Sequence, residues 1–116
     1  MPETDQTPVG LLRPDAGTLV ARTASTPWED AGDGFWMKPV FEDKKTGTRT
    51  LLMKVDPGAY SPPHAHDELE QIFMLEGEFS DQECTYKAGD YAVRAPGAMH
   101  TASSENGALM LLIYSP

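Results

Sequence analysis

A chain of 116 residues has room for one compact domain, and its 40% of hydrophobic residues are enough for one modest core. Its formal net charge of −9 would repel nucleic-acid phosphates and anionic lipids, and no basic segment offsets that charge. Because Cys84 is the only cysteine and no stretch approaches the roughly 18 apolar residues of a membrane span, we expect a cytoplasmic protein without disulfides that binds neither nucleic acid nor membranes.

The first 17 residues are polar and rich in acids and prolines, and we expect a flexible arm there. The remainder, residues 18–116, is expected to form a single domain. Segments rich in Val, Leu, Thr and aromatic residues predict short strands, because turn signals separate them about every 8–12 residues. The expected strands cover residues 18–23, 35–41, 48–55, 71–79, 83–87, 91–94 and 109–114.

The pattern of these segments is typical of an all-β protein. Segments 35–41 and 48–55 flank a polar turn that contains Gly47, which favours a hairpin. Pro39 suits an edge strand because it cannot donate a ladder hydrogen bond. No segment has the periodicity of a convincing amphipathic helix. Seven to nine short strands with frequent turns predict a β-barrel or β-sandwich.

The chain has only three histidines, and their spacing is the main chemical signal. His64 and His66 are two residues apart, so on a strand both side chains would point to the same face. Glu70 lies four residues further on and keeps the same parity if the strand continues. His100 is distant in sequence and would have to come from a neighbouring strand. Three imidazoles and one carboxylate are suitable ligands for one divalent transition metal.

A His-x-His pair alone is weak evidence, because such histidines are often surface residues or hydrogen-bonded residues of a strand. The glycines around the pair strengthen the metal interpretation, since glycine permits tight turns and close approach of backbones. Four glycines punctuate the two segments that contain the histidines: Gly58, Gly77, Gly89 and Gly97.

These two segments resemble the two motifs of the cupin superfamily. The first motif matches at every position: Gly58-x5-His64-x-His66-x3-Glu70-x6-Gly77. The second is similar to Gly89-x7-Gly97-x2-His100, with Pro96 one place later than usual and Ser104 where asparagine is usual. Cupins are double-stranded β-helix or jelly-roll barrels, so the resemblance implies this fold. It also implies four metal ligands: His64, His66, Glu70 and His100.

A closer resemblance, from about residue 28 to residue 113, is to the ChrR-like cupins. Four segments carry it: residues 61–64, 75–81, 86–91 and 95–100. That group includes the metal-binding domain of zinc anti-sigma factors and small cupins similar to acetylacetone-cleaving dioxygenases. The resemblance implies a small-molecule ligand or substrate and, by analogy with other small barrels, a homodimer.

The ligand set leaves the metal open among Fe, Zn, Mn and Ni. In an octahedral site four protein ligands leave two positions for substrate and dioxygen, as non-haem iron enzymes require. In a tetrahedral zinc site the same four ligands complete the coordination, and the metal is structural. Two functions follow: a dioxygenase that cleaves a small diketone or hydroxyketone, or a non-enzymatic metal- or ligand-binding module with a sensor or structural role. Glu70 either coordinates the metal or hydrogen-bonds a water on it.

Five apolar residues are candidates for a ligand pocket, although ordinary core packing is the simpler interpretation of each. Ile72 and Met74 share the parity of Glu70 and are expected to line the barrel near the metal. Phe41, Met53 and Met99 are weaker candidates. No further acid, base or nucleophile stands out, so the metal itself would carry any reaction.

Overall fold

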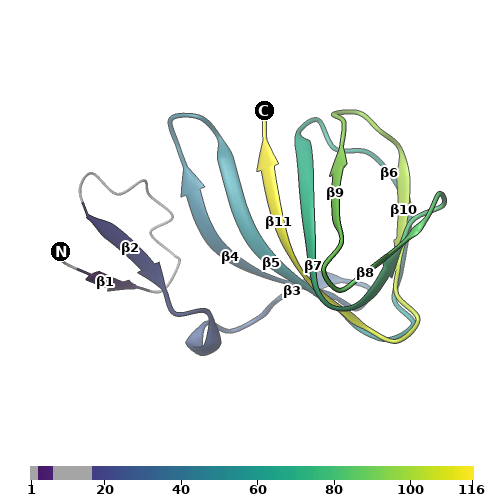
Figure 1. Cartoon of the computed structure of the whole chain (residues 1–116), viewed down its shortest axis with the longest axis horizontal. Coiled ribbons are helices and arrows are strands. Elements are labelled where there is room, and N and C mark those ends of the chain that lie inside the picture. Colours follow the sequence, from purple (N-terminus) through teal and green to yellow (C-terminus); the bar gives the residue numbers. More distant parts are fainter. Residues whose placement is uncertain (1–2, 7–16) are drawn as a thin grey trace.

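The computed structural model describes residues 3–6 and 17–116, and strands dominate the described part of the chain. One sheet has the order β3-β4-β5-β11-β7-β10-β6, with β8 and β9 also paired to β7, and it curls into a barrel (Figure 1). Its strands are β3 (Glu29–Gly32), β4 (Phe35–Asp43), β5 (Thr48–Val55), β6 (Tyr60–His64), β7 (Leu69–Ser80), β8 (Thr85–Lys87), β9 (Tyr91–Arg94), β10 (His100–Ser103) and β11 (Ala108–Ser115). The predicted all-β, jelly-roll type of barrel is confirmed.

Several expected strands lie where the pattern placed them. β5 and β9 have the predicted bounds, and β4 pairs with β5 as the expected antiparallel hairpin. Residue composition did not indicate β3, β6 or β10 as strands, although the histidine argument had placed His64 and His100 on strands. β3 is polar and fully exposed, and β6 contains Pro62 and Pro63, so neither shows the alternation or the residue types by which strands are identified.

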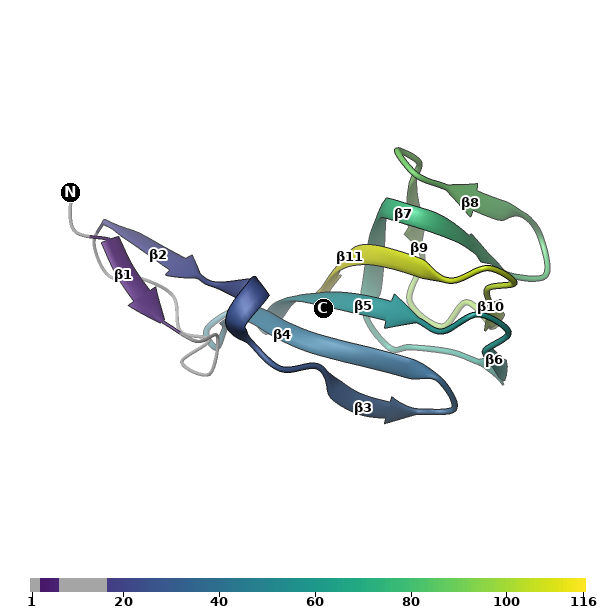
Figure 2. The same cartoon turned by 90° about the horizontal axis from the view of Figure 1, so that it is seen from below.

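A second, two-stranded sheet precedes the barrel. β1 (Glu3–Gln6) pairs in parallel with β2 (Thr18–Ala21), and this sheet lies beyond the β3–β4 side of the barrel (Figure 2). A 3₁₀ turn, η1 (Thr23–Ser25), connects β2 to the barrel. Much of the arm expected at residues 1–17 lies outside the described residues; in its described part, residues 3–6 form a strand.

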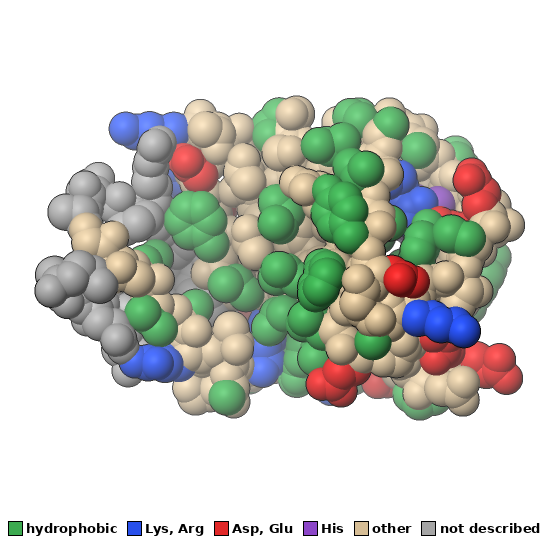
Figure 3. Space-filling view, in the orientation of Figure 1, with side chains coloured by type: hydrophobic (Ala, Val, Ile, Leu, Met, Phe, Trp, Pro, Cys, Tyr) green, Lys and Arg blue, Asp and Glu red, His purple; other side chains and the backbone are tan. Residues whose placement is uncertain are grey.

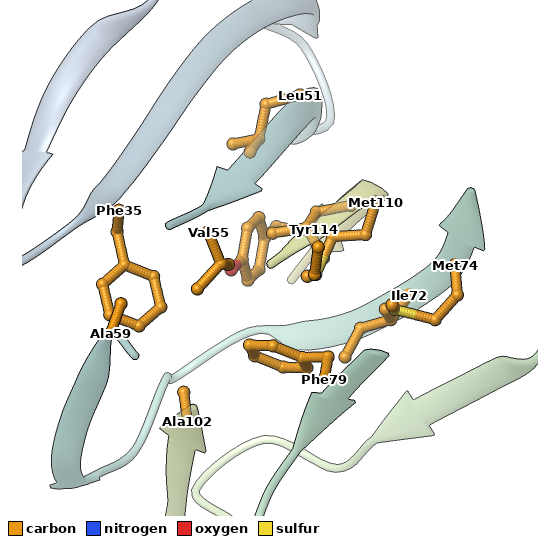
Figure 4. Close-up of a cluster of buried hydrophobic side chains, with 12 residues drawn as sticks. Phe35, Leu51, Val55, Ala59, Ile72, Met74, Phe79, Ala102, Met110 and Tyr114 are labelled. Carbon is orange, nitrogen blue, oxygen red and sulfur yellow. The ribbon is translucent and has the colours of Figure 1, made fainter. Parts of the chain in front are cut away.

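The core lies inside the curl of the sheet, where alternate residues of each strand point inward. Along β11 every second residue is buried, from Ala108 to Tyr114, and Ile72 and Met74 of β7 point to the same interior. Phe35, Val55 and Phe79 complete the middle of this core (Figure 4). β11 and β7 are adjacent, and their register places Tyr114 opposite Glu70, so both side chains point into the barrel.

The outer face of β7 and β9 is apolar and exposed. Hydrophobic side chains gather over this part of the molecule in Figure 3, and the exposed ones on the two strands are Phe73, Leu75, Tyr91 and Val93. The expected homodimer stays a prediction. Among the described residues there is no helix with the length and apolar character that crossing a membrane demands.

Candidate metal centre

The three histidines converge at one end of the barrel. His64 is the last residue of β6, His66 lies in the following loop, and His100 is the first residue of β10. β6 and β10 are antiparallel neighbours whose register pairs His100 with His64. The imidazole centroids are 4.2 Å apart for His64 and His100, 5.1 Å for His64 and His66, and 5.5 Å for His66 and His100. One candidate ligand atom from each residue lies within 4.8 Å of the other two.

The route by which Glu70 reaches this region differs from the prediction. The parity of His66 and Glu70 was predicted on the condition that the strand continues, and it does not, because β6 ends at His64 and β7 begins only at Leu69. The intervening loop is held by the second motif: the Gly97 N–H donates to the His66 carbonyl oxygen at 2.6 Å. The convergence of His66 and Glu70 therefore depends on contacts between strands, and the parity argument does not explain it.

Hydrogen bonds fix the orientation of two of the rings. The Nδ1 atom of His64 lies 2.9 Å from the Pro62 carbonyl oxygen, and that of His100 lies 2.9 Å from the Thr101 carbonyl oxygen. A carbonyl accepts only from a protonated nitrogen, so Nε2 of each ring keeps its lone pair for a metal.

His100 gives the clearest indication that these residues fit a metal. The residue is 4% exposed, and its Nε2 atom is buried without a hydrogen-bond partner among the described residues. Burial lowers the pKa of His100 below its ordinary value, so the ring is neutral near pH 7. A neutral, buried imidazole nitrogen that faces two further imidazoles has the chemistry of a transition-metal ligand.

Glu70 lies beside the trio, but both of its carboxylate oxygens are already hydrogen-bonded. Arg94 Nε donates to Oε1 at 2.9 Å, and the Tyr114 hydroxyl donates to Oε2 at 2.6 Å. Burial and the charge of Glu70 raise the pKa of Tyr114, so its hydroxyl stays protonated as a donor. The Oε2 atom of Glu70 is 3.9 Å from His66 Nε2.

Sequence reasoning missed the residues that hold Glu70. Arg94, on β9, bonds Glu70 with Nε and Asp81 with Nη1, at 3.1 Å for the latter. The one available signal was that Arg94 shares its face of β9 with Ala92, so a strand there puts both on the inward side. That signal does not identify the partner, because β9 and β7 pair only in the folded sheet.

The turn that follows β7 connects the two motifs. Gln82 Nε2 donates to the Met99 carbonyl oxygen at 3.0 Å, and its Oε1 accepts from the Thr101 N–H at 2.9 Å. These two bonds bracket His100. In the same turn Asp81 bonds Arg94, so this one turn supports both His100 and the partner of Glu70.

Ser104, in the second motif, forms hydrogen bonds that close the turn between β10 and β11. It is buried, and its hydroxyl donates to the Glu78 carbonyl oxygen at 2.5 Å and accepts from the Gly107 N–H at 2.9 Å. The departure from the usual asparagine therefore leaves a closed, hydrogen-bonded turn between β10 and β11.

A cavity of about 180 Å³ opens beside the trio, with His64 and His100 in its wall. The other described residues that line it are mainly apolar or small: Ala31, Gly32, Asp33, Phe35, Met53, Ser61, Phe79 and Ala102. Of the five pocket candidates, Met53 lies in this lining. Ile72 and Met74 lie in the core, Phe41 lines a separate hollow beside β2, and Met99 is exposed.

The sequence and the fold of this chain are similar to those of known cupins. The family model described as the ChrR cupin-like domain matches residues 16–116. No curated protein matches the chain significantly. An RmlC-like cupin from Shewanella frigidimarina is similar in structure, with a TM-score of 0.72, 25% identity, and coverage of 80% of this chain and 86% of that chain.

Two further structures share the fold at lower identity. The anti-sigma factor ChrR of Rhodobacter sphaeroides, solved in complex with SigE, has a TM-score of 0.71 and 23% identity over 82% of this chain, which spans about half (51%) of that protein. A candidate acetylacetone dioxygenase from Methylibium petroleiphilum has a TM-score of 0.77 and 14% identity, with coverage of 89% of this chain and 80% of that chain. At these identities the likeness shows the fold alone.

Proposed function

The chain belongs to the ChrR cupin-like domain family, and we propose that it binds one divalent transition metal through His64, His66 and His100 and acts as a dioxygenase on a small diketone or hydroxyketone. One observation carries the proposal. Three imidazoles come together, two of them in the wall of a largely apolar cavity, and the buried Nε2 of His100 has no hydrogen-bond partner among the described residues. A bound metal would act as a Lewis acid on the substrate oxygens and, if it is iron, would supply redox chemistry.

The cavity favours a small neutral substrate. Its volume of about 180 Å³ suits a molecule of a few carbon atoms, and Phe35, Met53 and Phe79 make its wall largely apolar. None of the described lining residues is Lys or Arg, whereas Asp33 is acidic. A carboxylate would lose its hydration there without gaining a cation from the protein, so ketone and hydroxyl groups are favoured over carboxylates.

The protein's own contribution is to position the substrate and exclude water. Phe79 and Ala102 are buried, and they line the cavity together with His100. An apolar enclosure strengthens electrostatic contacts to whatever the metal holds and protects reactive species from water. His64 and His100 both lie in the cavity wall, so a ligand in the cavity would be oriented towards the metal by the shape of the site.

The test is metal analysis and oxygen uptake on protein purified without chelators or added metal. We expect about one iron per chain and oxygen consumption that matches the loss of acetylacetone or a small hydroxyketone. Malonate is the matched control, because it has a similar length but carries carboxylates, and we expect no oxygen uptake with it. One zinc per chain with no uptake on any ketone would refute the dioxygenase.

The second candidate function is a non-enzymatic metal-dependent binding module. It is favoured by the scarcity of acid–base groups in the cavity, where Asp33 is the one carboxylate among the described lining residues. For this function, zinc-loaded protein would bind the neutral ketone in a titration and turn none of it over.

A further inference from the structure

The outer face of β5, β11, β7 and β9 is apolar across four neighbouring strands. β11 shows this most clearly, because residues 108–113 are apolar at every position although only every second one is buried in the core. A strand that has one face in water alternates apolar with polar residues, whereas a continuous apolar run is typical of a strand covered on both faces. The sequence of β11 is therefore that of a strand with a second layer over its outer face.

Strand register arranges the outward side chains of this face in rows. The central row crosses all four strands and is uncharged: Leu52, Leu111, Phe73 and Tyr91. The row beside it is also uncharged: Thr50, Ile113, Gln71 and Val93. Two of the polar groups satisfy each other, because the Tyr91 hydroxyl donates to Gln71 Oε1 at 2.6 Å. Covering this face would therefore leave the tyrosine hydroxyl hydrogen-bonded.

These side chains expose enough apolar surface for a stable dimer. The four most exposed are between 41% and 57% exposed: Phe73, Leu75, Tyr91 and Val93. At about 150–250 Å² for a whole aromatic side chain and somewhat less for an aliphatic one, they expose on the order of 300–400 Å². The half-buried apolar residues beside them on β5 and β11 raise this to roughly 600 Å², the lower end of what each partner buries in a specific interface.

The charges around the face favour a second copy as its occupant. The chain has a net charge of −9, so two copies repel one another wherever their acids meet, and neither uncharged row contains an acid. At one end of the face Leu109 lies between Lys54 on β5 and Glu76 on β7. A two-fold axis along β11 would place each copy's Lys54 opposite the other copy's Glu76. The face is thus complementary to itself in charge as well as in apolar surface.

The cation of this pair is already held in position. The Lys54 ammonium lies 5.0 Å from the ring centroid of Trp28 and 5.4 Å from that of Trp36. Glu76, in contrast, is exposed and forms no ion pair with any other described residue. An ordered cation loses little side-chain freedom when a carboxylate binds it, so the contact between copies would cost less entropy than one between two mobile side chains.

We infer that two copies of this chain pair face to face through β5, β11, β7 and β9, with the two-fold axis along β11. A basic partner would be favoured by acids in the uncharged rows, and an acidic partner by cations there, and the face offers neither. A hollow of about 400 Å³ at the same end, lined by Lys54, Glu76 and Leu109 among others, leaves room for side chains of the second copy. The pairing uses none of the three histidines, so it is independent of the metal binding proposed above.

The oligomeric state of the full chain tests this inference. By sedimentation over about 1–200 μM, a range that covers weak and standard interfaces, we expect wild-type protein at twice the mass of one chain. Phe73→Lys puts a charge into the central row of both copies, so we expect its dissociation constant to rise at least about a hundredfold. Tyr60→Lys is the matched control, since Tyr60 is an aromatic residue of similar exposure (54%) on β6, outside the face, and should dimerise like wild type.

A pair of charge reversals tests the position of the axis. Lys54→Glu and Glu76→Lys each place like charges opposite one another twice in a dimer, so each alone should raise the dissociation constant about tenfold. An equimolar mixture of the two variants should form a heterodimer as stable as wild type to within about threefold, because each chain then meets opposite charges at both positions. Circular dichroism establishes folding, and Val93→Lys replaces Phe73→Lys should that variant fail to fold.

The possible results bear on separate parts of this pairing. A chain that stays monomeric at about 200 μM would overturn the inference, since something other than a second copy would then cover the face. A dimer that Phe73→Lys leaves intact would place the contact elsewhere on the molecule. A mixture that dimerises no better than either charge variant alone would refute the axis along β11. Equal dimerisation of His100→Ala and wild type, with and without zinc, would separate the assembly from the metal site.

Discussion

Asp81 makes the hydrogen bonds around the candidate metal site sensitive to acid. Burial raises its pKa, but hydrogen bonds from Tyr86, from the backbone N–H groups of Cys84 and Glu83, and from Arg94 outweigh burial and lower the pKa from 3.8 to about 2. Because the folded-state pKa is the lower one, the carboxylate stabilises the fold above about pH 4, and this contribution is lost as the pH falls towards 2.

We predict that Asp81→Asn removes this pH dependence. At pH 6 the variant should be less stable than wild type by on the order of 1–2 kcal/mol, and at pH 2 to 3 the difference should shrink towards zero. Urea unfolding at several pH values, followed by circular dichroism, measures the difference. Asp90→Asn, at a turn acid outside the Arg94 network, is the control. A penalty that stays constant with pH would show that the ionised carboxylate is not its source.

At the scale of single residues, the three candidate ligands can be predicted from the sequence more easily than the residues that surround them. His64, His66 and His100 stand out because histidines are rare in the chain and their spacing resembles two motifs. The partners of Glu70 do not stand out, since Arg94 and Tyr114 come from β9 and β11 and approach it only through strand register. Local spacing contains no information about such register.

Among the elements, β7 depends most on a single residue. Its first half pairs with β9 and β11 and its end pairs with β8, so the strand passes from one side of the barrel to the other. Gly77 lies between the two halves with φ +75°, and a Cβ there would be 2.0 Å from the Gly107 carbonyl oxygen. That oxygen belongs to the backbone and accepts from the Glu78 N–H, so it cannot move without breaking the ladder.

Gly77→Ala should therefore destabilise the barrel by about 3 kcal/mol or more. Gly89→Ala is the matched control, because Gly89 also has a positive φ (+91°) but nothing lies within 4 Å of its Cβ position. Its cost should be about 1–2 kcal/mol, the strain of the left-handed conformation alone. Thermal unfolding of both variants gives the comparison, and equal losses would show that the contact with Gly107 is unimportant.

Strands that pack against the core could be predicted from the sequence, whereas strands defined mainly by pairing with a neighbour could not. β5 and β11 alternate or cluster apolar residues because they pack against the core, and the sequence pattern reflects that burial. β6 and β10 are short, and they are defined by pairing with each other. The end of the barrel that carries the three histidines is thus built from the elements with the weakest local strand signal, and the histidine spacing and the motif resemblance drew attention to them.

For the whole molecule, the metal would add a further link between the edge strand β6, the loop that follows it, and β10. β6 is the last strand in the order of the sheet and pairs only with β10 among the described strands, with a bulge between His100 and Ala102. His66 adds the loop after β6 to the same centre. A metal on the trio would therefore fasten this edge of the barrel, and the free energy of binding would add to the free energy of unfolding.

We predict that zinc raises the midpoint temperature of unfolding. A metal at about one hundred times its dissociation constant stabilises the native state by about 2.7 kcal/mol, which for a chain of this size is a shift on the order of 10 °C. Magnesium is the control ion, since it prefers oxygen ligands and should give no shift. His100→Ala should abolish most of the zinc shift and keep a cooperative transition, whereas a full zinc shift in that variant would mean that the stabilising ion binds elsewhere.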